Sequence, residues 1–258
     1  MTYLCIGVPY ALGQFKTESS IEALKASGIA EELGAAWVDL QPDFAAHEHP
    51  VVAVNRALAE VIAAHPDETP LIFAQDCTSV WGALKGLETQ SPAIIWYDAH
   101  GDFNTPETSP SGYLGGMPLA AVVGRGNQAL IQAIGTPLVD EGDVLISDAR
   151  DLDPQEGVNL RASRLTLLPK MDDLLTAALP TKPLYIHMDV DVIDPTEIPA
   201  QNYPAPNGPS TEQTAATLRR IVRDAKIAGV LFSLWDQSLP GADLAQTNML
   251  KLVRALVD

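Results

Sequence analysis

The segment from Asp98 to Asp102 contains the residue types of a metal site. It reads DAHGD and follows the apolar run AIIWY, so two carboxylates and an imidazole stand at alternate positions after an expected strand. Because side chains alternate faces along a strand, Asp98, His100 and Asp102 would point the same way if the strand continued. Such a cluster of charges needs protons or a cation to neutralise it, and a divalent metal ion is the natural partner.

A second acidic pair follows another apolar run. Asp189 and Asp191 stand two positions apart after LYIHM. Taken alone, either acidic segment could be a solvated loop or a helix cap. Together the two acidic segments predict a binuclear site. Oxygen-rich coordination with one imidazole suits Mn²⁺ better than it suits a structural zinc ion. His187 lies deeper in the apolar run and is expected to be a buried structural residue rather than a ligand.

Strands and helices that alternate along the chain must position these residues. Strands are expected at residues 3–9, 36–40, 71–74, 93–97, 144–146, 165–168, 184–188 and 229–234. Helices are expected at 19–33, 51–64, 79–87, 119–123, 127–134, 171–178, 210–228 and 243–257, with loops at 147–157 and 195–209. This alternation predicts an α/β fold with a mainly parallel sheet covered on both faces. The ligand crevice of such a sheet lies beyond the carboxyl ends of its strands, where both acidic segments fall.

Composition and charge restrict the class of protein. The chain has 258 residues, 47% of them hydrophobic, and lacks a linker that would separate two domains, so one domain spanning residues 1–258 is expected. Its net charge of −17 opposes binding to nucleic acid or an anionic membrane and favours cationic ligands. The apolar runs are shorter than the ~20 residues of a membrane span. Two cysteines fit a reducing compartment, so a cytoplasmic location is expected.

Three segments resemble motifs of the arginase and agmatinase family of binuclear manganese ureohydrolases. WYDAHGDFNT is similar to that family's D-A-H-x-D motif, HMDVDVIDP to its D-x-D-x-x-D-P motif, and ARDLDPQE to a segment between them. The resemblance covers most of the chain. It implies a three-layer arginase-like fold with a central, mainly parallel, eight-stranded sheet flanked by helices, and two Mn²⁺ ions at its carboxyl edge.

The resemblance also implies a set of metal ligands. Asp98 and Asp189 would bridge the two ions. Asp102 would bind the first ion, and His100 and Asp191 would bind the second. The remaining first-metal ligand is a histidine in G-G-D-H-S of the family, and AQDCTS places Cys77 there. A thiolate is softer than Mn²⁺ prefers. Either that ion binds weakly, or a softer ion enters, or Cys77 stands near the site without binding.

Four further matches concern the substrate. Asn104, Ser109 and Ser111 match family positions that hold the α-carboxylate of an amino acid, and Asp153 matches one that holds its α-amino group. These matches favour an amino-acid substrate over a simple diamine. Glu156, in the same segment as Asp153, could contribute, or it could be a solvated loop acid.

Two positions depart from the arginase pattern. GYLGG replaces G-N-L-H-G, so Gly115 stands where the family has an acid–base histidine. The glutamate that clamps the guanidinium is replaced by Leu234, or by Asp236 after a short shift. With Cys77, this combination resembles the branch that hydrolyses Nω-hydroxy-L-arginine to ornithine and hydroxyurea. Loss of the imidazole is expected to make room for the Nω-hydroxyl group.

The expected activity is hydrolysis of a guanidino carbon–nitrogen bond in a small cationic amino acid. The metal ions would acidify a bridging water, and Asp102 would orient the resulting hydroxide and carry its proton to the leaving amine, so Asp102 and His100 are the expected catalytic residues. Asp236 is a candidate for the substrate-binding set. Alternatives are another guanidino or formimino substrate, as in arginase, agmatinase or formimidoylglutamase, or a degenerate non-catalytic member. A homo-oligomer is possible in this family.

Overall fold

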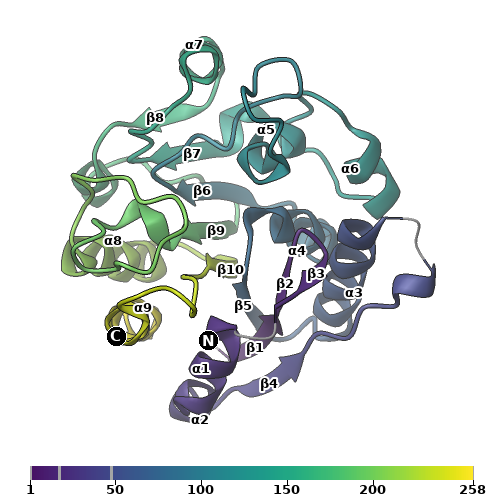
Figure 1. Cartoon of the computed structure of the whole chain (residues 1–258), viewed down its shortest axis with the longest axis vertical. Coiled ribbons are helices and arrows are strands. Elements are labelled where there is room, and N and C mark those ends of the chain that lie inside the picture. Colours follow the sequence, from purple (N-terminus) through teal and green to yellow (C-terminus); the bar gives the residue numbers. More distant parts are fainter. Residues whose placement is uncertain (1, 17–18, 47–48, 258) are drawn as a thin grey trace.

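The computed structural model describes residues 2–16, 19–46 and 49–257, and an eight-stranded sheet forms the centre of this part of the chain (Figure 1). In spatial order its strands are β4 (Ala36–Asp39), β1 (Tyr3–Val8), β5 (Thr69–Ala74), β10 (Ile227–Ser233), β9 (Leu184–Asp189), β6 (Ala93–Tyr97), β7 (Val144–Ser147) and β8 (Thr166–Leu168). All seven pairings between these neighbours are parallel. A separate antiparallel hairpin, which the sequence did not predict, joins β2 (Tyr10–Ala11) to β3 (Gln14–Phe15).

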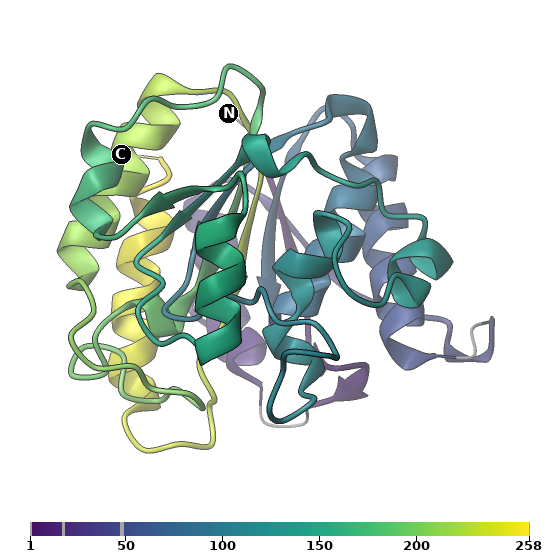
Figure 2. The same ribbon diagram turned by 90° about the horizontal axis from the view of Figure 1, so that it is seen from above.

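Helices cover both faces of the sheet, which Figure 2 shows from above. One layer comprises α1 (Ser20–Ala26), α2 (Ile29–Glu32), α8 (Thr211–Asp224) and α9 (Ala242–Arg254). The other comprises α3 (Pro50–Ala64), α4 (Val80–Gly86), α5 (Pro118–Val122) and α6 (Ala129–Ile134). Helix α7 (Pro154–Ala162) lies toward the β7–β8 end of the sheet (Figure 1).

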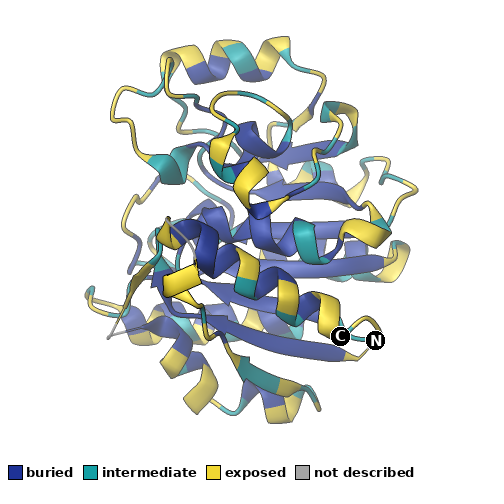
Figure 3. Cartoon of the chain, turned by 90° about the vertical axis from the view of Figure 1, so that its right-hand side faces the viewer, coloured by how far each residue is buried: buried dark blue, intermediate teal, exposed yellow. Residues whose placement is uncertain are grey.

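The six inner strands are buried on both sides, as their almost continuous apolar sequences require, whereas the edge strands β4 and β8 are partly exposed (Figure 3). In β6, Ile95 and Tyr97 join the core on one face, whereas Ile94 and Trp96 join the core on the other. This alternation fixes the direction of every side chain up to the end of the strand. No helix within the described residues is long and apolar enough to cross a membrane.

The α/β class and the mainly parallel eight-stranded sheet are confirmed, but several element boundaries differ. The helix expected at 210–228 ends earlier, because α8 stops at Asp224 and β10 begins at Ile227. The helix expected at 19–33 is divided into α1 and α2, because Gly28 adopts a left-handed conformation with φ of 76°. Residues 171–178 contain a short 3₁₀ turn, Met171–Leu175, rather than an α-helix. The expected loop at 147–157 contains the start of α7, where Pro154 occupies the first turn and Asp153 and Glu156 form a capping box.

Candidate metal centre and active site

Strand register brings the acidic segments to one level at the carboxyl edge of the sheet. Ser233 of β10 pairs with Asp189 of β9, and Tyr97 of β6 pairs with Met188. Asp98, one residue beyond β6, therefore lies beside Asp189. A cavity of about 320 Å³ opens at this edge. The predicted residues that line it are Cys77, Asp98, His100, Asp102, Asn104, Ser109, Ser111, Asp153, Asp189 and Asp191.

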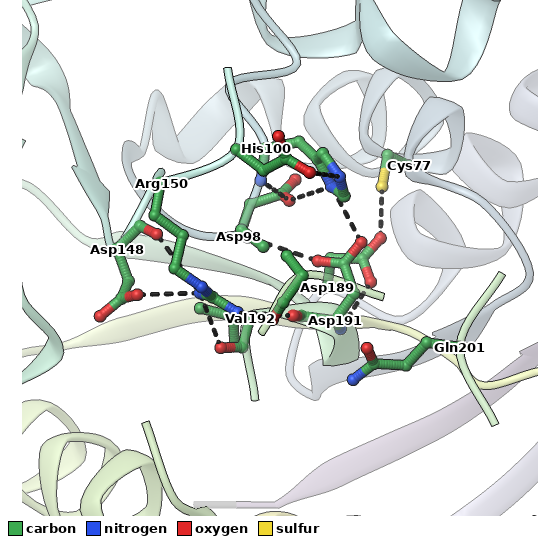
Figure 4. Close-up of polar contacts among 12 residues, drawn as sticks. Cys77, Asp98, His100, Asp148, Arg150, Asp189, Asp191, Val192 and Gln201 are labelled. Carbon is green, nitrogen blue, oxygen red and sulfur yellow. Dashed lines mark hydrogen bonds and ion pairs between the residues drawn. The ribbon is translucent and has the colours of Figure 1, made fainter. Parts of the chain in front are cut away.

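Two overlapping groups of donor atoms line this cavity, and Figure 4 labels all of their residues except Asp102. Cys77, Asp98 and Asp102 form one group, and Asp98, His100 and Asp191 form the other, with the donor atoms of each group within 4.8 Å of one another. Asp98 belongs to both groups. The Oδ2 atom of Asp189 accepts a hydrogen bond of 3.0 Å from Cys77 Sγ, which places this carboxylate beside the first group.

The convergence of Asp98, His100 and Asp102 arises from a loop and not from a continued strand, since β6 ends at Tyr97 as expected. The amide of His100 donates a 2.7 Å hydrogen bond back to Asp98 Oδ1. Asp102 adopts φ of 47°, a left-handed conformation that costs free energy for a residue other than glycine. The loop thus turns the carboxylate of Asp102 toward Cys77 and Asp98.

The charges of the cluster need a cation for balance. Burial alone would lower the pKa of His100, but hydrogen bonds to Asp191 and Asp98 raise it to about 12; His100 Nδ1 lies 3.0 Å from Asp191 Oδ2. Burial and then the neighbouring carboxylates raise the pKa of Asp102 and of Asp191 well above the ordinary range, and that of Asp189 to about 6. Asp102 and Asp191 therefore retain protons near neutral pH that a divalent cation would displace.

The donor set fits a pair of divalent ions. Asp102 Oδ2 is buried and has no hydrogen-bond partner among the described residues, although a buried carboxylate oxygen normally has one. The two donor groups share a carboxylate, which is how two adjacent ions are commonly bridged. Carboxylates with one imidazole suit Mn²⁺ in the second group. The Cys77 thiol makes the first group a softer set of metal ligands than the second.

Cys77 lies among the donor atoms of the first group. Its side chain is buried, and burial followed by Asp189, Asp102 and Asp98 raises the pKa of the thiol well above its ordinary value. The thiol therefore stays protonated and donates to Asp189 unless a cation stabilises the thiolate. Its Sγ atom is within reach of an ion held by Asp98 and Asp102.

The residues predicted to hold the amino-acid part of a substrate lie together on the cavity wall. Asn104 Nδ2 donates a 2.9 Å hydrogen bond to Asp153 Oδ2, and the hydroxyls of Ser109 and Ser111 are 3.4 Å apart. These groups present hydroxyls, an amide and a carboxylate to one region of the cavity. They suit a ligand with a carboxylate and an ammonium group.

Asp236 is not brought to this wall. Its carboxylate accepts hydrogen bonds from the amide and the hydroxyl of Ser238, in the turn that follows β10. Among the described residues of this segment, Ser233, Leu234 and Trp235 line the cavity. The geometry therefore gives no support to Asp236 as a substrate-binding residue and places an apolar side chain, Leu234, in the wall.

Arg150 is a positioning residue that the sequence did not reveal (Figure 4). Its guanidinium donates to the carboxylate of Asp148 and to the carbonyl oxygens of Asp191, Val192 and Ala205, with the last bond at 2.7 Å. It thus joins the turn that carries a metal-ligand candidate to the proline-rich loop 195–209. The arginine is visible in ARDLDPQE, but the carbonyls it binds are distant in the chain and have no sequence signal.

Glu156 is also structural in this site, so the alternative of a solvated loop acid is wrong. Its side chain is only 3% exposed. Oε1 accepts a 2.9 Å hydrogen bond from the amide of Phe103, and Oε2 accepts one of 3.2 Å from the amide of Asp153. Glu156 therefore attaches the start of α7 to the loop that carries Asp102. The D-P-x-E spacing was the available signal, because it is typical of a capping box.

His187 is buried structure, as expected. Its ring stacks on Trp96 with centroids 3.6 Å apart, and burial lowers the pKa of His187 to about 3, so the imidazole stays neutral. The indole of Trp96 in turn donates a 3.0 Å hydrogen bond to Asp98 Oδ2. The stacked pair therefore holds the orientation of Asp98, and its role is to support the carboxylate that both donor groups share.

Comparison with known proteins places this geometry in one family. The family model described as Arginase family matches residues 16–232. The arginase of Bacillus subtilis (strain 168) is 32% identical over 180 residues, a match that spans 64% of this chain and 61% of that relative. The crystal structure of an arginase from Bacillus subtilis superimposes with a TM-score of 0.87 at 26% identity and covers 100% of this chain and 98% of the other.

A second relative bears on the substrate. The N(omega)-hydroxy-L-arginine amidinohydrolase of Streptomyces lavendulae is 30% identical over 203 residues, which cover 77% of this chain and 67% of that protein. The family match extends over more than half of the chain and includes both acidic segments. Together with the two donor groups at the carboxyl edge of the sheet, it confirms the resemblance in the motifs. The chain belongs to the arginase family, whose members are metal-dependent hydrolases of carbon–nitrogen bonds.

Proposed function

We propose that this chain is a binuclear manganese amidinohydrolase that converts Nω-hydroxy-L-arginine to ornithine and hydroxyurea. The observation that carries the proposal is the pair of donor groups sharing Asp98 at the base of a cavity whose wall holds the amino-acid-binding set. Support for the hydroxylated substrate comes from Cys77 and Gly115, the two departures from the arginase pattern, and from the Streptomyces lavendulae relative.

The ligand assignment follows from the donor groups. Cys77, Asp98 and Asp102 would hold one ion, and Asp98, His100 and Asp191 the other, with Asp189 beside the first group. Divalent ions bound there supply Lewis-acid charge that makes a water molecule acidic near neutral pH. The acidic surroundings also favour a substrate with a cationic guanidino group.

Asp102 is the residue best placed to manage the proton. Its Oδ2 atom has no hydrogen-bond partner among the described residues and is thus available to orient an attacking water. Deprotonated Asp102 would accept the proton of that water and deliver it to the leaving nitrogen. Asn104, Ser109, Ser111 and Asp153 would hold the α-carboxylate and α-amino ends, so that the guanidino carbon reaches the base of the cavity.

One observation favours a second candidate substrate. Leu234 lines the cavity where the arginase pattern has a guanidinium-binding glutamate, so the wall lacks a carboxylate from that segment among the described residues. A guanidino or formimino acid of different shape would then be hydrolysed by the same chemistry. A degenerate member that has lost catalysis would instead fail to bind a full set of ions, with Cys77 as the physical cause.

The test is a substrate screen with metal measured in the same sample. Protein stripped of metal and reloaded with Mn²⁺ is offered Nω-hydroxy-L-arginine, L-arginine, agmatine and formimino-glutamate. The expected result is two ions per chain and the highest kcat/KM for Nω-hydroxy-L-arginine. A higher kcat/KM for another compound would transfer the proposal to that substrate. Absence of hydrolysis with zero ions bound would support the degenerate alternative.

Three properties remain predictions. A single domain over residues 1–258 and a cytoplasmic location follow from composition and cysteine content. A homo-oligomer follows from the family resemblance alone. Limited proteolysis, cell fractionation and light scattering test them in that order.

A further inference from the structure

The space beside Gly115 is filled by an aromatic ring. A Cβ atom on Gly115 would lie 2.3 Å from Cε1 and 2.9 Å from the hydroxyl oxygen of Tyr113. Real Cβ atoms do not approach other atoms so closely, so any side chain at position 115 would displace the ring. The absence of a side chain at position 115 therefore does not leave its Cβ position empty, because the end of the Tyr113 side chain lies there.

Tyr113 is part of a chain of rings across the cavity. Its ring centroid lies 5.7 Å from that of Tyr203, which comes from the proline-rich loop. The Tyr203 ring in turn lies 6.4 Å from His100, edge to face at 87°. Both tyrosines line the cavity, yet they remain 39% and 56% exposed. Two large aromatic side chains exposed together at the mouth of a site are typical of ligand contact.

The Tyr113 hydroxyl has suitable chemistry for this position. Burial, then Tyr203 and the nearby Asp76 and Cys77, raise the pKa of the phenol above its ordinary value, so it keeps its proton near neutral pH. A protonated phenol both donates and accepts a hydrogen bond, and so does the hydroxyl of an Nω-hydroxyguanidino group. The face of a tyrosine ring also attracts a cationic group.

We propose that Tyr113 is a specificity-determining residue that takes the place of the absent histidine, with Tyr203 as the second wall of the same subsite. Its hydroxyl forms a hydrogen bond with the substituent on the guanidino nitrogen, and the two rings face the cationic group. Gly115 makes this arrangement possible because it has no side chain. The inference rests on the proposed function and names the group that selects a hydroxylated guanidine over an unsubstituted one.

The first test removes the hydroxyl and keeps the ring. In Tyr113→Phe, kcat/KM for Nω-hydroxy-L-arginine is expected to fall about fivefold, the size of one hydrogen bond between neutral groups, and that for L-arginine to change less. An equal effect on both substrates would overturn the inference. A purely structural role of Tyr113 would lower both values together, so the ratio of the two substrates distinguishes selection from loss of fold.

The second test displaces the Tyr113 ring by adding a side chain at position 115. Gly115→Ala is expected to displace Tyr113 and to reduce the preference for Nω-hydroxy-L-arginine in the same direction as Tyr113→Phe. Gly116→Ala is the matched control, because a Cβ at Gly116 meets none of the described atoms within 4 Å and its backbone φ is not positive. In a Tyr113→Ala background, Gly115→Ala should add no further change, since the ring it displaces is gone. Additive effects would contradict the displacement.

Ligand binding separates this inference from the proposed function. The metal-free full-length protein, in which turnover does not interfere, is titrated by calorimetry with Nω-hydroxy-L-arginine and with L-arginine. The wild type is expected to bind the hydroxylated compound more tightly, and Tyr113→Phe to lose that preference. If the metal-loaded wild type hydrolyses neither compound, the proposed function fails while this binding preference still supports Tyr113. If the preference is absent in the wild type or unchanged in the variant, the inference fails.

Discussion

Asp98 is the residue on which the candidate metal centre depends most, because its carboxylate belongs to both donor groups. The Trp96 indole and the His100 amide each donate a hydrogen bond to one of its oxygens. Because these two hydrogen bonds already fix the orientation of the Asp98 carboxylate, this side chain loses little further conformational entropy when an ion binds. The other members of the two donor groups each belong to one group only, so substitutions of Asp98 and of these members should differ in how many ions they remove.

Asp98→Asn tests that difference. The amide keeps the shape but removes the shared charge, so the variant is expected to retain fewer than one ion per chain after dialysis and to lose activity by about a hundredfold or more. His100→Asn changes the second group only and is the comparison; it should retain one ion. Metal analysis of dialysed protein gives the counts. Equal ion content in both variants would contradict the sharing of Asp98.

Cys77→Ser tests the thiol as a ligand. A hydroxyl is a harder donor than a thiolate, so the affinity for Zn²⁺ relative to Mn²⁺ is expected to fall about tenfold. Competition titration of the two ions measures the ratio. Cys5→Ser is the matched control, because Cys5 is the other free thiol and is a buried core residue of β1. If the two variants have the same ion preference, Cys77 does not bind metal.

At the scale of elements, the active-site loops are held by α7 and by Arg150 rather than by strand geometry. Glu156 at the start of α7 bonds to the amide of Phe103, next to Asp102. A Cβ on Gly101 would lie 2.7 Å from Glu156 Oε1, so the loop packs directly against this carboxylate. Arg150 fixes the turn of Asp191 in the same manner. Glu156 therefore holds the loop that carries Asp102, and Arg150 holds the turn that carries Asp191.

Glu156→Ala is expected to lower the free energy of unfolding by about 1–3 kcal/mol, because it leaves the buried amide of Phe103 and the part-buried amide of Asp153 without acceptors. The same change should loosen the loop of Asp102 and weaken binding of the first metal ion. Gln155→Ala alters the exposed neighbour in the same turn and serves as the control, with an expected change below about 0.5 kcal/mol. Denaturant titration gives both values. Equal destabilisation by the two changes would assign the effect to the helix rather than to Glu156.

At the scale of the whole molecule, the buried charges couple folding to metal and pH. The folded-state pKa of Asp102 and of Asp191 is raised by burial and by neighbouring carboxylates, and that of His100 is raised to about 12 by Asp191 and Asp98 in spite of burial. Between the unfolded and folded pKa values, the folded protein holds more protons than the unfolded chain. The stability of the metal-free protein therefore falls as the pH rises from about 5 to about 8.

Metal should reverse this dependence. Because the ions bind deprotonated ligands, the increase in Tm on adding Mn²⁺ is expected to be larger at about pH 8 than at about pH 5. Thermal unfolding with and without Mn²⁺ at both pH values measures the difference. Asp98→Asn, which removes the shared ligand, should lose most of the metal-dependent increase. An increase in Tm that is the same at both pH values would contradict proton displacement from the cluster.

Local sequence was sufficient for the strands of the central sheet and for the residue types of the donor groups. Apolar runs predicted the strands, and Asp98, Asp189 and Asp191 stand directly after β6 or at the end of β9, so residue order alone placed them at the carboxyl edge. Helix α7 was missed because its buried residues, Glu156, Gly157 and Leu160, do not form a regular apolar stripe. The capping box was the only local signal of its start.

The sequence by itself determined the α/β fold and the residue types of the metal centre, since both follow from patterns a few residues long. Only the tertiary structure decided how these residues meet. The left-handed turn at Asp102 bends the chain against its local preference, and the contacts of Arg150 with distant carbonyls and of Tyr113 with Tyr203 join segments that are remote in the chain. Such contacts are set by register and packing of the whole sheet, and no short segment contains that information.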